Sequence, residues 1–599
     1  MTFTFRTVAR RGGAAAPPGG PRRRAGNDRA RDLARHLRRL TLLDVAIAAA
    51  VLVGLLVLAR LGRDTTVSFR AAPEVAGDTG LARLPNDAAR TLLRMFVALG
   101  ASYAFALAYG KAAASNRRAE RILVPILDVL QSVPVLGFLT VTTTVFLSLF
   151  PGSVLGLELV AIFAIFTAQA WNLAFSFHAS LQGTPRELTE MTRLLGLSRW
   201  RRFWTLEVPD AAHGLIWNGM MSMGGGWFFL VASEAISVGG VDHALPGVGS
   251  YTGAAIRAGD LGAVGWAIAT MTVLVLGVNV LFWRPLVAWS ERFRHDETPA
   301  ELAPRSLVLD LLRRSHWPRA VGRLRRRGAE PLNRLGDRLL GTDRRPLDTD
   351  RGGTGARVLD VAAHLAIAVG LVWFLRYVTE VEGWRIFLSP FGQGLLTLAR
   401  VVVVVVASTV VWVPIGVRIG LDPRLSRVAQ PLVQLLASFP ANFLFPVAVW
   451  AFLRTGLSIE VGGVVLMALG AQWYVLFNAV AGAQAIPNDL REAADDLGVR
   501  GWLRWRRLYL PAVLPAYVTG GITASGGAWN ASIVSEVVTY GTTTLTATGL
   551  GAYITEATER GDAHRLLAGI AVMAVYVVGL NRLVWHPLGR LAARRTAGG

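Results

Sequence analysis

Residues 487–511 read PNDLREAADDLGVRGWLRWRRLYLP, and residues 185–209 read PRELTEMTRLLGLSRWRRFWTLEVP. The two stretches lie 302 positions apart, and the match continues without a gap from 185–286 to 487–588. Each stretch is a polar loop between long hydrophobic segments. A fixed internal offset is the sequence signature of a duplicated architecture. Two like halves facing each other in a bilayer are the plan of a transporter.

An earlier run also recurs, because residues 91–134 return 306 positions later as 397–440. When the two halves are aligned at offsets of 302 and 306 positions, identical residues match at many points along the sequence. The matched pairs are Arg94/Arg400, Gly110/Gly416, Pro125/Pro431, Ser132/Ser438, Glu190/Glu492, Gly196/Gly498, Pro209/Pro511, Trp227/Trp529, Glu234/Glu536 and Gly247/Gly549.

The composition indicates a membrane protein. Of 599 residues, 53% are hydrophobic and only 17% are charged, whereas soluble domains carry about 25% charged residues. Several hydrophobic segments approach or exceed the roughly 20 residues needed to cross a bilayer. Cysteine is absent, which excludes disulfides and a cysteine-based metal site.

We therefore expect an all-α polytopic membrane protein with about twelve membrane-spanning helices, arranged as two tandem six-helix halves. The spans are predicted near 42–60, 90–110, 122–150, 157–178, 213–238, 263–288, 359–378, 394–420, 430–453, 459–482, 514–538 and 565–586. Six spans in each half give the two copies the same orientation, related by an axis along the membrane normal.

The net charge of +22 is almost entirely arginine, since Lys111 is the only lysine. The arginines concentrate in the N-terminal tail, in the loops after the second and fourth spans, and in the linker between the halves. The positive-inside rule then places these connections and both termini in the cytoplasm. Nucleic acid is not an expected partner, because no aromatic-interleaved basic motif accompanies the charge.

These patterns divide the chain into five parts. They are a basic disordered cytoplasmic tail at 1–40, a first transmembrane half at 41–290 with its repeated core at 90–288, an arginine-rich cytoplasmic linker at 291–357, a second transmembrane half at 358–590 with its repeated core at 394–588, and a cytoplasmic tail at 591–599.

The polar loop in each half predicts a short amphipathic helix, a turn at glycine, a second basic helical piece and a proline before the next span. Its apolar side chains need a partner surface. The residues that define the pattern are Glu190, Gly196, Trp200 and Pro209 in the first copy, and Glu492, Ala493, Ala494, Gly498, Trp502 and Pro511 in the second.

The second copy resembles the loop of ABC-importer permeases, in which Glu-Ala-Ala is followed by a glycine and later by a proline. The first copy keeps the glutamate, glycine and proline but has Met191 and Thr192 in place of the two alanines. The resemblance implies that two ABC ATPase subunits dock on these loops, with contacts of unequal quality. It also implies a duplicated type I ABC importer fold in a bacterial inner membrane, with a periplasmic or lipid-anchored solute-binding protein as a further partner.

A second motif follows each loop. A glycine-rich span carries Trp227 or Trp529, then Glu234 or Glu536, and a Gly-x-Gly comes before the last span. The motif resembles permeases for nitrate, sulfonate, taurine and bicarbonate, which implies a small anion as solute. Carboxylates in a membrane are costly unless they face protein or water. The two glutamates therefore either belong to the translocation path or its gate, or are structural carboxylates.

Other polar residues inside the spans are further candidates for the path. Gln169 and Gln472 lie late in the fourth span of each half, and Pro134 and Pro440 interrupt the third. Prolines free backbone carbonyls where helices line a cavity. Arg94 and Arg400 lie near the outer end of the second span, where they either attract an anion or extend to the lipid headgroups.

The chain carries no phosphate-binding loop, because Gly110-Lys111 has Phe105 in place of the first glycine. We therefore predict that it is not an enzyme and binds no cofactor or metal, and that ATP and Mg²⁺ are bound by the partner ATPases. The predicted function is the permease subunit of an ABC importer. The alternative is a twelve-helix secondary transporter driven by an ion gradient, which would need no docking loops.

Overall fold

The computed structural model describes residues 42–64, 78–132, 135–238, 241–293, 306–315, 317–341 and 354–597. The predicted tail at 1–40, Pro134 and parts of the predicted linker lie outside these residues. The described part is almost wholly helical, which confirms the all-α class, with two short β-hairpins that the sequence patterns did not predict.

The first half runs through α2 (Leu42–Asp64), α3 (Leu84–Ala113), α4 (Arg117–Ser132), α5 (Val135–Leu149), α6 (Val154–Gly183), α7 (Arg186–Leu194), α8 (Arg199–Arg202), α10 (Ala212–Glu234), β1 (Ala235–Val238), β2 (Val241–Ala244), α11 (Val248–Ala258), α12 (Leu261–Val278) and α13 (Arg284–Ser290). Two helices of the linker follow, α14 (Leu307–Arg314) and α15 (Trp317–Leu340).

The second half repeats this order with α16 (Thr354–Val378), α17 (Leu388–Leu421), α18 (Pro423–Ser438), α19 (Phe445–Thr455), α20 (Ile459–Gln484), α21 (Asn488–Asp496), α22 (Gly501–Arg504), α23 (Leu510–Ser535), β3 (Val537–Tyr540), β4 (Thr543–Thr546), α24 (Leu550–Glu559), α25 (Ala563–Leu580) and α26 (His586–Ala597). Because α26 continues to Ala597, most of the tail predicted at 591–599 is helical.

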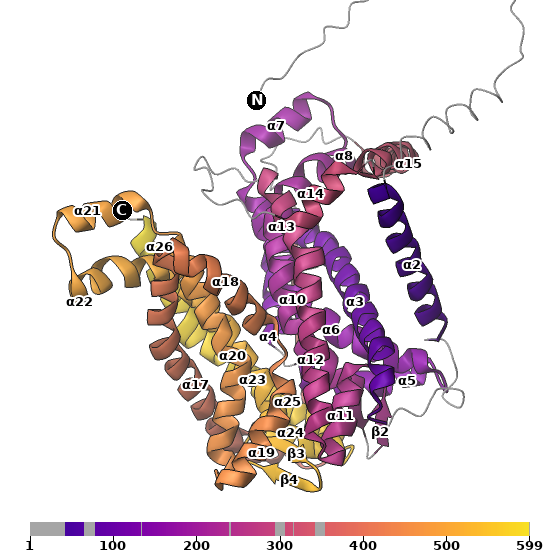
Figure 1. Ribbon diagram of the computed structural model, residues 1–599, viewed down its shortest axis with the longest axis vertical. Helices are drawn as coiled ribbons and strands as arrows, with labels where there is room; N and C mark the ends of the chain where they lie inside the picture. The colour runs from indigo at the N-terminus through magenta and orange to yellow at the C-terminus, as the bar shows by residue number, and fades with distance from the viewer. Residues whose placement is uncertain are drawn as a thin grey trace, which may run out of the picture.

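The two halves stand side by side with their long helices roughly along the same direction (Figure 1). The predicted polar loops, α7–α8 and α21–α22, lie at one end of the molecule, which we call the loop end. Both hairpins lie at the other, the hairpin end. This arrangement follows from the duplication, since each half places equivalent elements at equivalent ends.

Seven helices of the described residues are long and apolar enough to cross a membrane. They correspond to the second, fourth, fifth and sixth predicted spans of the first half and the second, fourth and sixth of the second half. The predicted third spans at 122–150 and 430–453, which we expect to be interrupted at proline, are each divided into two helices, α4–α5 and α18–α19. The physical cause in the second half is Pro440, whose ring and missing N–H are incompatible with a helix interior.

The hairpins link the two halves at the hairpin end. In each, four residue pairs join antiparallel strands, from Ala235↔Ala244 in one and from Val537↔Thr546 in the other. The turn of the second hairpin reaches the first half, where Gly541 N donates to Ile256 O at 2.9 Å and the Tyr540 hydroxyl donates to Gly259 O at 3.0 Å.

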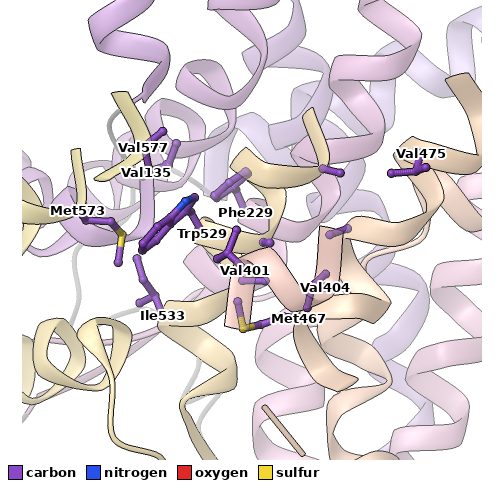
Figure 2. Close-up of a cluster of buried hydrophobic side chains, with 14 of the residues drawn as sticks. Val135, Phe229, Val401, Val404, Met467, Val475, Trp529, Ile533, Met573 and Val577 are labelled. Atoms are coloured by element: carbon purple, nitrogen blue, oxygen red, sulfur yellow. The ribbon is translucent and has the colours of Figure 1, made fainter. Parts of the chain in front are cut away.

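The largest apolar cluster contains residues from both halves and therefore forms their interface. In Figure 2, Trp529 lies among Met573 and Val577 of its own half and Val135 and Phe229 of the first half, with Val135 next to Val577 and Phe229 on the other side of the indole. Helices in lipid are held together by close van der Waals packing, so these interlocking side chains join the two halves.

Candidate functional sites: two loops and two buried carboxylates

The two polar loops have the predicted local structure. In the first, α7 ends before Gly196, which adopts a left-handed φ of 63°, and in the second, α21 ends before Gly498 with a φ of 65°. The N–H of Leu197 donates to Thr192 O and that of Val499 to Ala494 O. This bonding closes the end of each helix and requires the backbone conformation that glycine alone adopts without strain.

Apolar side chains of both loops remain exposed at the loop end. They are Met191, Leu194 and Leu195 in the first loop and Leu490, Leu497, Trp502 and Leu503 in the second. Glu190 and Glu492 are exposed as well, whereas Ala494 is buried and Pro209 and Pro511 are half-buried. Clusters of large exposed apolar side chains with a charged rim are typical of protein interaction sites.

The two loops differ in what covers the tryptophan. Trp200 packs on Gly336 of the linker helix α15, and its indole Nε1 donates to Asn333 Oδ1 at 3.1 Å. The equivalent Trp502 is 73% exposed. The first loop is therefore partly occupied by the chain itself, and the second is open.

Asp337 joins α15 to the first loop. Its carboxylate accepts a 2.8 Å hydrogen bond from Arg201 Nε and another from the Ser198 hydroxyl. One turn further on, the Gly341 carbonyl accepts from Arg199 N at 3.1 Å. The Ser198 hydroxyl, followed by Arg201, holds the pKa of Asp337 below its ordinary value. The carboxylate therefore stays ionised and bonded at neutral pH.

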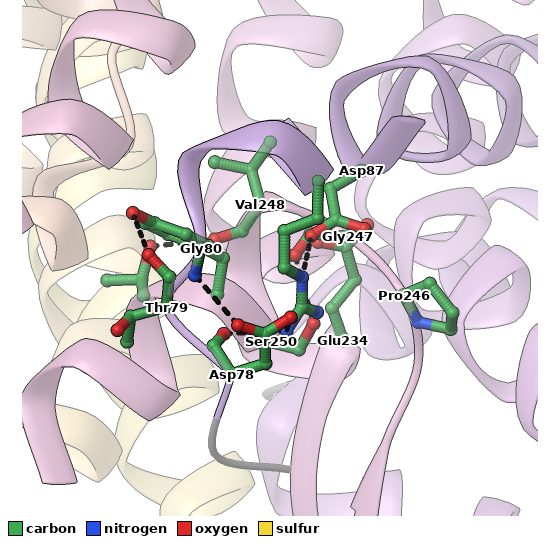
Figure 3. Close-up of polar contacts among 12 residues, drawn as sticks. Asp78, Thr79, Gly80, Asp87, Glu234, Pro246, Gly247, Val248 and Ser250 are labelled. Atoms are coloured by element: carbon green, nitrogen blue, oxygen red, sulfur yellow. Dashed lines mark hydrogen bonds and ion pairs between the residues drawn. The ribbon is translucent and has the colours of Figure 1, made fainter. Parts of the chain in front are cut away.

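The carboxylate of Glu234 is the centre of a buried polar cluster at the hairpin end (Figure 3). Its Oε1 accepts from Thr91 Oγ1 at 2.8 Å and from Arg94 at 2.7 Å, and its Oε2 accepts from Gly249 N at 2.7 Å. Arg94 in turn donates to both carboxylate oxygens of Glu158, at 2.6 and 2.7 Å. These contacts tie α3, α6, α10 and α11 together.

The second half repeats the cluster with one difference. Glu536 accepts from Thr397 Oγ1 at 2.8 Å, from Arg400 at 2.8 Å and from Gly551 N at 2.7 Å. Arg400 also pairs with Glu460, whose side chain is 47% exposed, whereas the equivalent Glu158 is 4% exposed. The cluster of the first half is sealed, and that of the second is open to its surroundings.

The Gly-x-Gly motif is explained by these carboxylates. A Cβ on Gly247 would overlap the carboxyl group of Glu234, and a Cβ on Gly549 would overlap that of Glu536. Both glycines have extended φ values, near ±180°, so close approach and not backbone strain requires them. In each half, the glutamate that follows the tryptophan therefore packs directly against the Gly-x-Gly motif.

Sequence reasoning missed four members of these clusters. Thr91 and Thr397 accept the N–H of Val248 and of Leu550 and donate to the central glutamates. Glu158 and Glu460 neutralise the arginines. A signal was available for both pairs, because the threonines begin the matched run at 91–134 and the glutamates recur at the same 302-residue offset as the loops.

Arg94 and Arg400 are buried in ion pairs and do not extend to headgroups. The Nε and both terminal nitrogens of Arg94 are occupied by Glu158, Glu234 and the Pro246 carbonyl. One guanidinium facing two carboxylates offers little attraction to a passing anion. We therefore regard the arginines as positioning residues for the glutamates.

The interrupted third segments meet the fifth span of the opposite half. The N–H of Val135, at the start of α5, donates to Asn530 Oδ1 of α23 at 3.1 Å. In the related place, Asn442 Nδ2 donates to Phe228 O of α10 at 3.3 Å. Asn530 and Phe228 are themselves 302 positions apart. Irregular backbone is tolerated at membrane depth only where protein or a cavity covers it, so the interface of the halves is the candidate path.

A small cleft opens at this interface, lined by Met220, Met221, Gln434, Ala437, Ser438, Tyr474 and Phe477. The glycine-rich face of α10 forms part of it, since a Cβ on Gly224 would come within 3.2 Å of Ser438 Oγ. The glycines thus allow α10 and α18 to approach closely, as small residues do between membrane helices.

The other predicted path residues occupy different environments. Gln169 is fully buried against Met95 and Ser102, whereas Gln472 accepts from Trp412 Nε1 at 2.8 Å, so the two glutamines are not structural equivalents. Trp227 and Trp529 are buried at matching positions. Within the described residues, the indole N–H of Trp529 has no hydrogen-bond partner.

Comparison with known proteins assigns the fold to a family. The model of the family described as "binding-protein-dependent transport system inner membrane component" matches residues 102–289 and again 412–585. The chain belongs to this family. Both matches coincide with the two halves, so the duplication seen in the sequence is a duplication of the family's transport domain.

Individual relatives align with about a third of the chain. The nitrate import permease protein NrtB of Leptolyngbya laminosa is 25% identical over 34% of this chain and 73% of its own length. The bicarbonate transport system permease protein CmpB of Synechococcus elongatus is 27% identical over 32% of this chain and 64% of its own length. The taurine transport system permease protein TauC of Escherichia coli is 27% identical over 32% of this chain and 69% of its own length. The protein is therefore an inner-membrane transport permease component.

Proposed function

We propose that this chain is the transmembrane permease subunit of an ABC importer for a small anion, with two membrane domains fused in one polypeptide. The observation that carries the proposal is the pair of loops. Each half presents, at the same end, a helix closed by a left-handed glycine and rimmed by exposed apolar side chains. Two loops of equivalent position and backbone structure, at one end of two homologous halves, suit two copies of one partner.

In this proposal, ABC ATPase subunits dock on α7–α8 and α21–α22. The loop end and both termini are then cytoplasmic, in agreement with the arginines of the loops and linker. ATP and Mg²⁺ are bound by the ATPases, and a solute-binding protein delivers solute to the hairpin end. ATP-driven movement of the loops is transmitted through α6, α10 and their counterparts to the interface of the halves.

The class of solute is proposed from two sources. The relatives named above are permeases for nitrate, bicarbonate and taurine, all of which carry an oxyanion group. The interface of the halves contains the unpaired N–H donor of Trp529, and a buried donor without a partner is costly, typically by about 1–3 kcal/mol, unless a ligand or water supplies an acceptor. The buried glutamates act as gate-positioning groups in this proposal.

The coupling assignment is tested by reconstituting the chain with its ATPase and binding protein in lipid vesicles. Replacement of Glu190, Gly196, Glu492 and Gly498 by arginine is expected to abolish ATPase binding and ATP-dependent uptake. The control replaces exposed Thr543 and Thr544 of the hairpin end by arginine, which leaves ATPase binding intact. ATP-dependent uptake that survives the fourfold change contradicts the coupling role. Uptake driven by an ion gradient without any ATPase would instead support a secondary transporter.

The solute class is tested with the same vesicles by competition among nitrate, bicarbonate, taurine and an uncharged sugar. Trp529→Phe keeps the aromatic packing and removes the N–H donor. We expect a severalfold higher KM for the transported anion with little change in ATPase binding. An unchanged KM excludes the indole from the path, and preference for the sugar excludes the anion proposal.

A further inference from the structure

The linker helix α15 presents two faces that nothing in the proposed transport cycle uses. One is docked on the first loop through Gly336 and Asp337. The other carries Leu332, Leu335 and Leu339, which are 60%, 54% and 75% exposed. Spacings of three and four residues put these leucines on a single stripe of the helix.

The same helix is strongly basic. Its sequence, WPRAVGRLRRRGAEPLNRLGDRLL, contains seven arginines against Glu330 and Asp337, and Asp337 is already paired with Arg201. Among the side chains that the structure describes, Arg334 and Arg338 are exposed one turn apart, on a strip of the helix that borders the leucine stripe, and Arg334 also pairs with Glu330. An apolar stripe bordered by basic residues is the pattern of a helix that lies in a membrane interface.

The position of α15 agrees with this chemistry. In Figure 1, α15 lies at the loop end, at a level between α7 and the upper end of α2. The apolar run of α2 begins at Leu42, with Leu52, Val53 and Leu56 exposed along its length. Because an apolar helix of this length is suited to the hydrocarbon of a bilayer, a helix at the level of its end is expected at the headgroup boundary.

We infer that α15 binds the surface of the same bilayer that the chain spans, and that its ligand is anionic lipid. The leucine stripe enters the headgroup boundary while the arginines meet lipid phosphates. Each basic residue near an anionic leaflet contributes about fivefold to the local binding equilibrium. Because α15 also holds Trp200, the lipid surface is connected to the first loop and not to the second. This last connection rests on the proposed coupling role of that loop, whereas the lipid contact does not.

The absence of cysteine allows a direct test on the full chain. A single cysteine in Leu335→Cys is labelled with a fluorophore, and the chain is placed in phosphatidylcholine vesicles with or without phosphatidylglycerol. Quenching by lipids that carry a spin label near the headgroup reports contact. Leu497→Cys, on the exposed second loop, is the matched control.

We expect the label at 335 to be quenched at least about threefold more than the label at 497 when phosphatidylglycerol is present. Raising the salt to about 1 M shortens the electrostatic range from about 10 Å to 3 Å, so the difference should shrink. Arg334→Gln with Arg338→Gln should shrink it at low salt as well.

Equal quenching at 335 and 497 in both lipid mixtures overturns the inference. Shielding of the label at 335 only after the ATPase is added also overturns it, because the stripe would then be part of the ATPase contact. Neither readout involves uptake, so failure of the lipid contact is distinguishable from failure of the proposed transport function.

Discussion

Arg94 and Glu158 form a doubly hydrogen-bonded ion pair from which solvent is almost wholly excluded, with side chains 2% and 4% exposed. Its counterpart in the second half, Arg400 with Glu460, is exposed on the carboxylate side. The two halves keep the same charges in different surroundings, so the two ion pairs should contribute differently to the stability of the folded chain.

This difference predicts unequal effects of one mutation. In Glu158→Gln, Arg94 keeps Glu234 as its counter-ion, but two buried guanidinium N–H groups then face an amide with only one acceptor oxygen. An unpaired buried donor costs about 1–3 kcal/mol, whereas exposed ion pairs contribute about 0–1 kcal/mol. Glu158→Gln should therefore lower the Tm of the purified chain far more than Glu460→Gln. Equal Tm values for the two variants would contradict the asymmetry of the clusters.

The close packing of Gly247 and Gly549 against the glutamates predicts that neither position tolerates a larger side chain. Gly247→Ala and Gly549→Ala each place a methyl group inside a glutamate carboxyl, and the neighbouring backbone cannot yield without breaking the cluster. We expect a loss of about 2 kcal/mol or more, the upper range of overpacking effects. Gly265→Ala, where nothing lies within 4 Å, is the control. Thermal unfolding in detergent measures all three, and a harmless Gly247→Ala would refute the packing explanation.

The covering of Trp200 predicts unequal ATPase contacts. Trp502 is free to insert into a partner, while Trp200 is held by α15. Buried tryptophans at interfaces commonly contribute about 2 kcal/mol or more to binding. Trp502→Ala should therefore weaken ATPase binding roughly thirtyfold, and Trp200→Ala should weaken it less. Surface plasmon resonance on the immobilised chain distinguishes them, and the reverse order would refute the prediction.

The ionisation of Asp337 predicts an acid-sensitive contact between α15 and the first loop. Its pKa is lowered in the folded chain, so the contact has its full strength above the ordinary value for aspartate and is lost as the pH falls through the lowered value. Fluorescence transfer between labels on α15 and α8 should stay constant from neutral to mildly acidic pH and fall in stronger acid.

Ser198→Ala removes the first cause of that lowered pKa. The midpoint of the acid transition should then move upward, towards the ordinary aspartate value near about 3.9. Asp337→Asn is the control and should show no acid transition. An unchanged midpoint in Ser198→Ala would show that another group controls the contact.

The sequence was sufficient to predict the duplicated all-α plan, the glycine turns of both loops and the paired motif of Glu234 and Gly247. These features are local or repeat at a fixed offset, so one chain displays them twice. The prolines indicated an interruption of the third spans, but not the contact that supports it, because α5 begins with a hydrogen bond to Asn530 of the distant half. The docking of Trp200 on Gly336 was equally invisible, since the second half has no equivalent linker helix.

The hydrogen bond between Val135 and Asn530 joins residues far apart in the sequence, and this separation has a consequence for biosynthesis. Every member of the Glu234 cluster belongs to the first half, so this half can complete its polar core as soon as Gly249 has left the ribosome. The N–H of Val135 must wait for Asn530, a partner 395 residues later in translation. The first half is therefore expected to insert early with its third segment unfinished, and the arrival of α23 completes it.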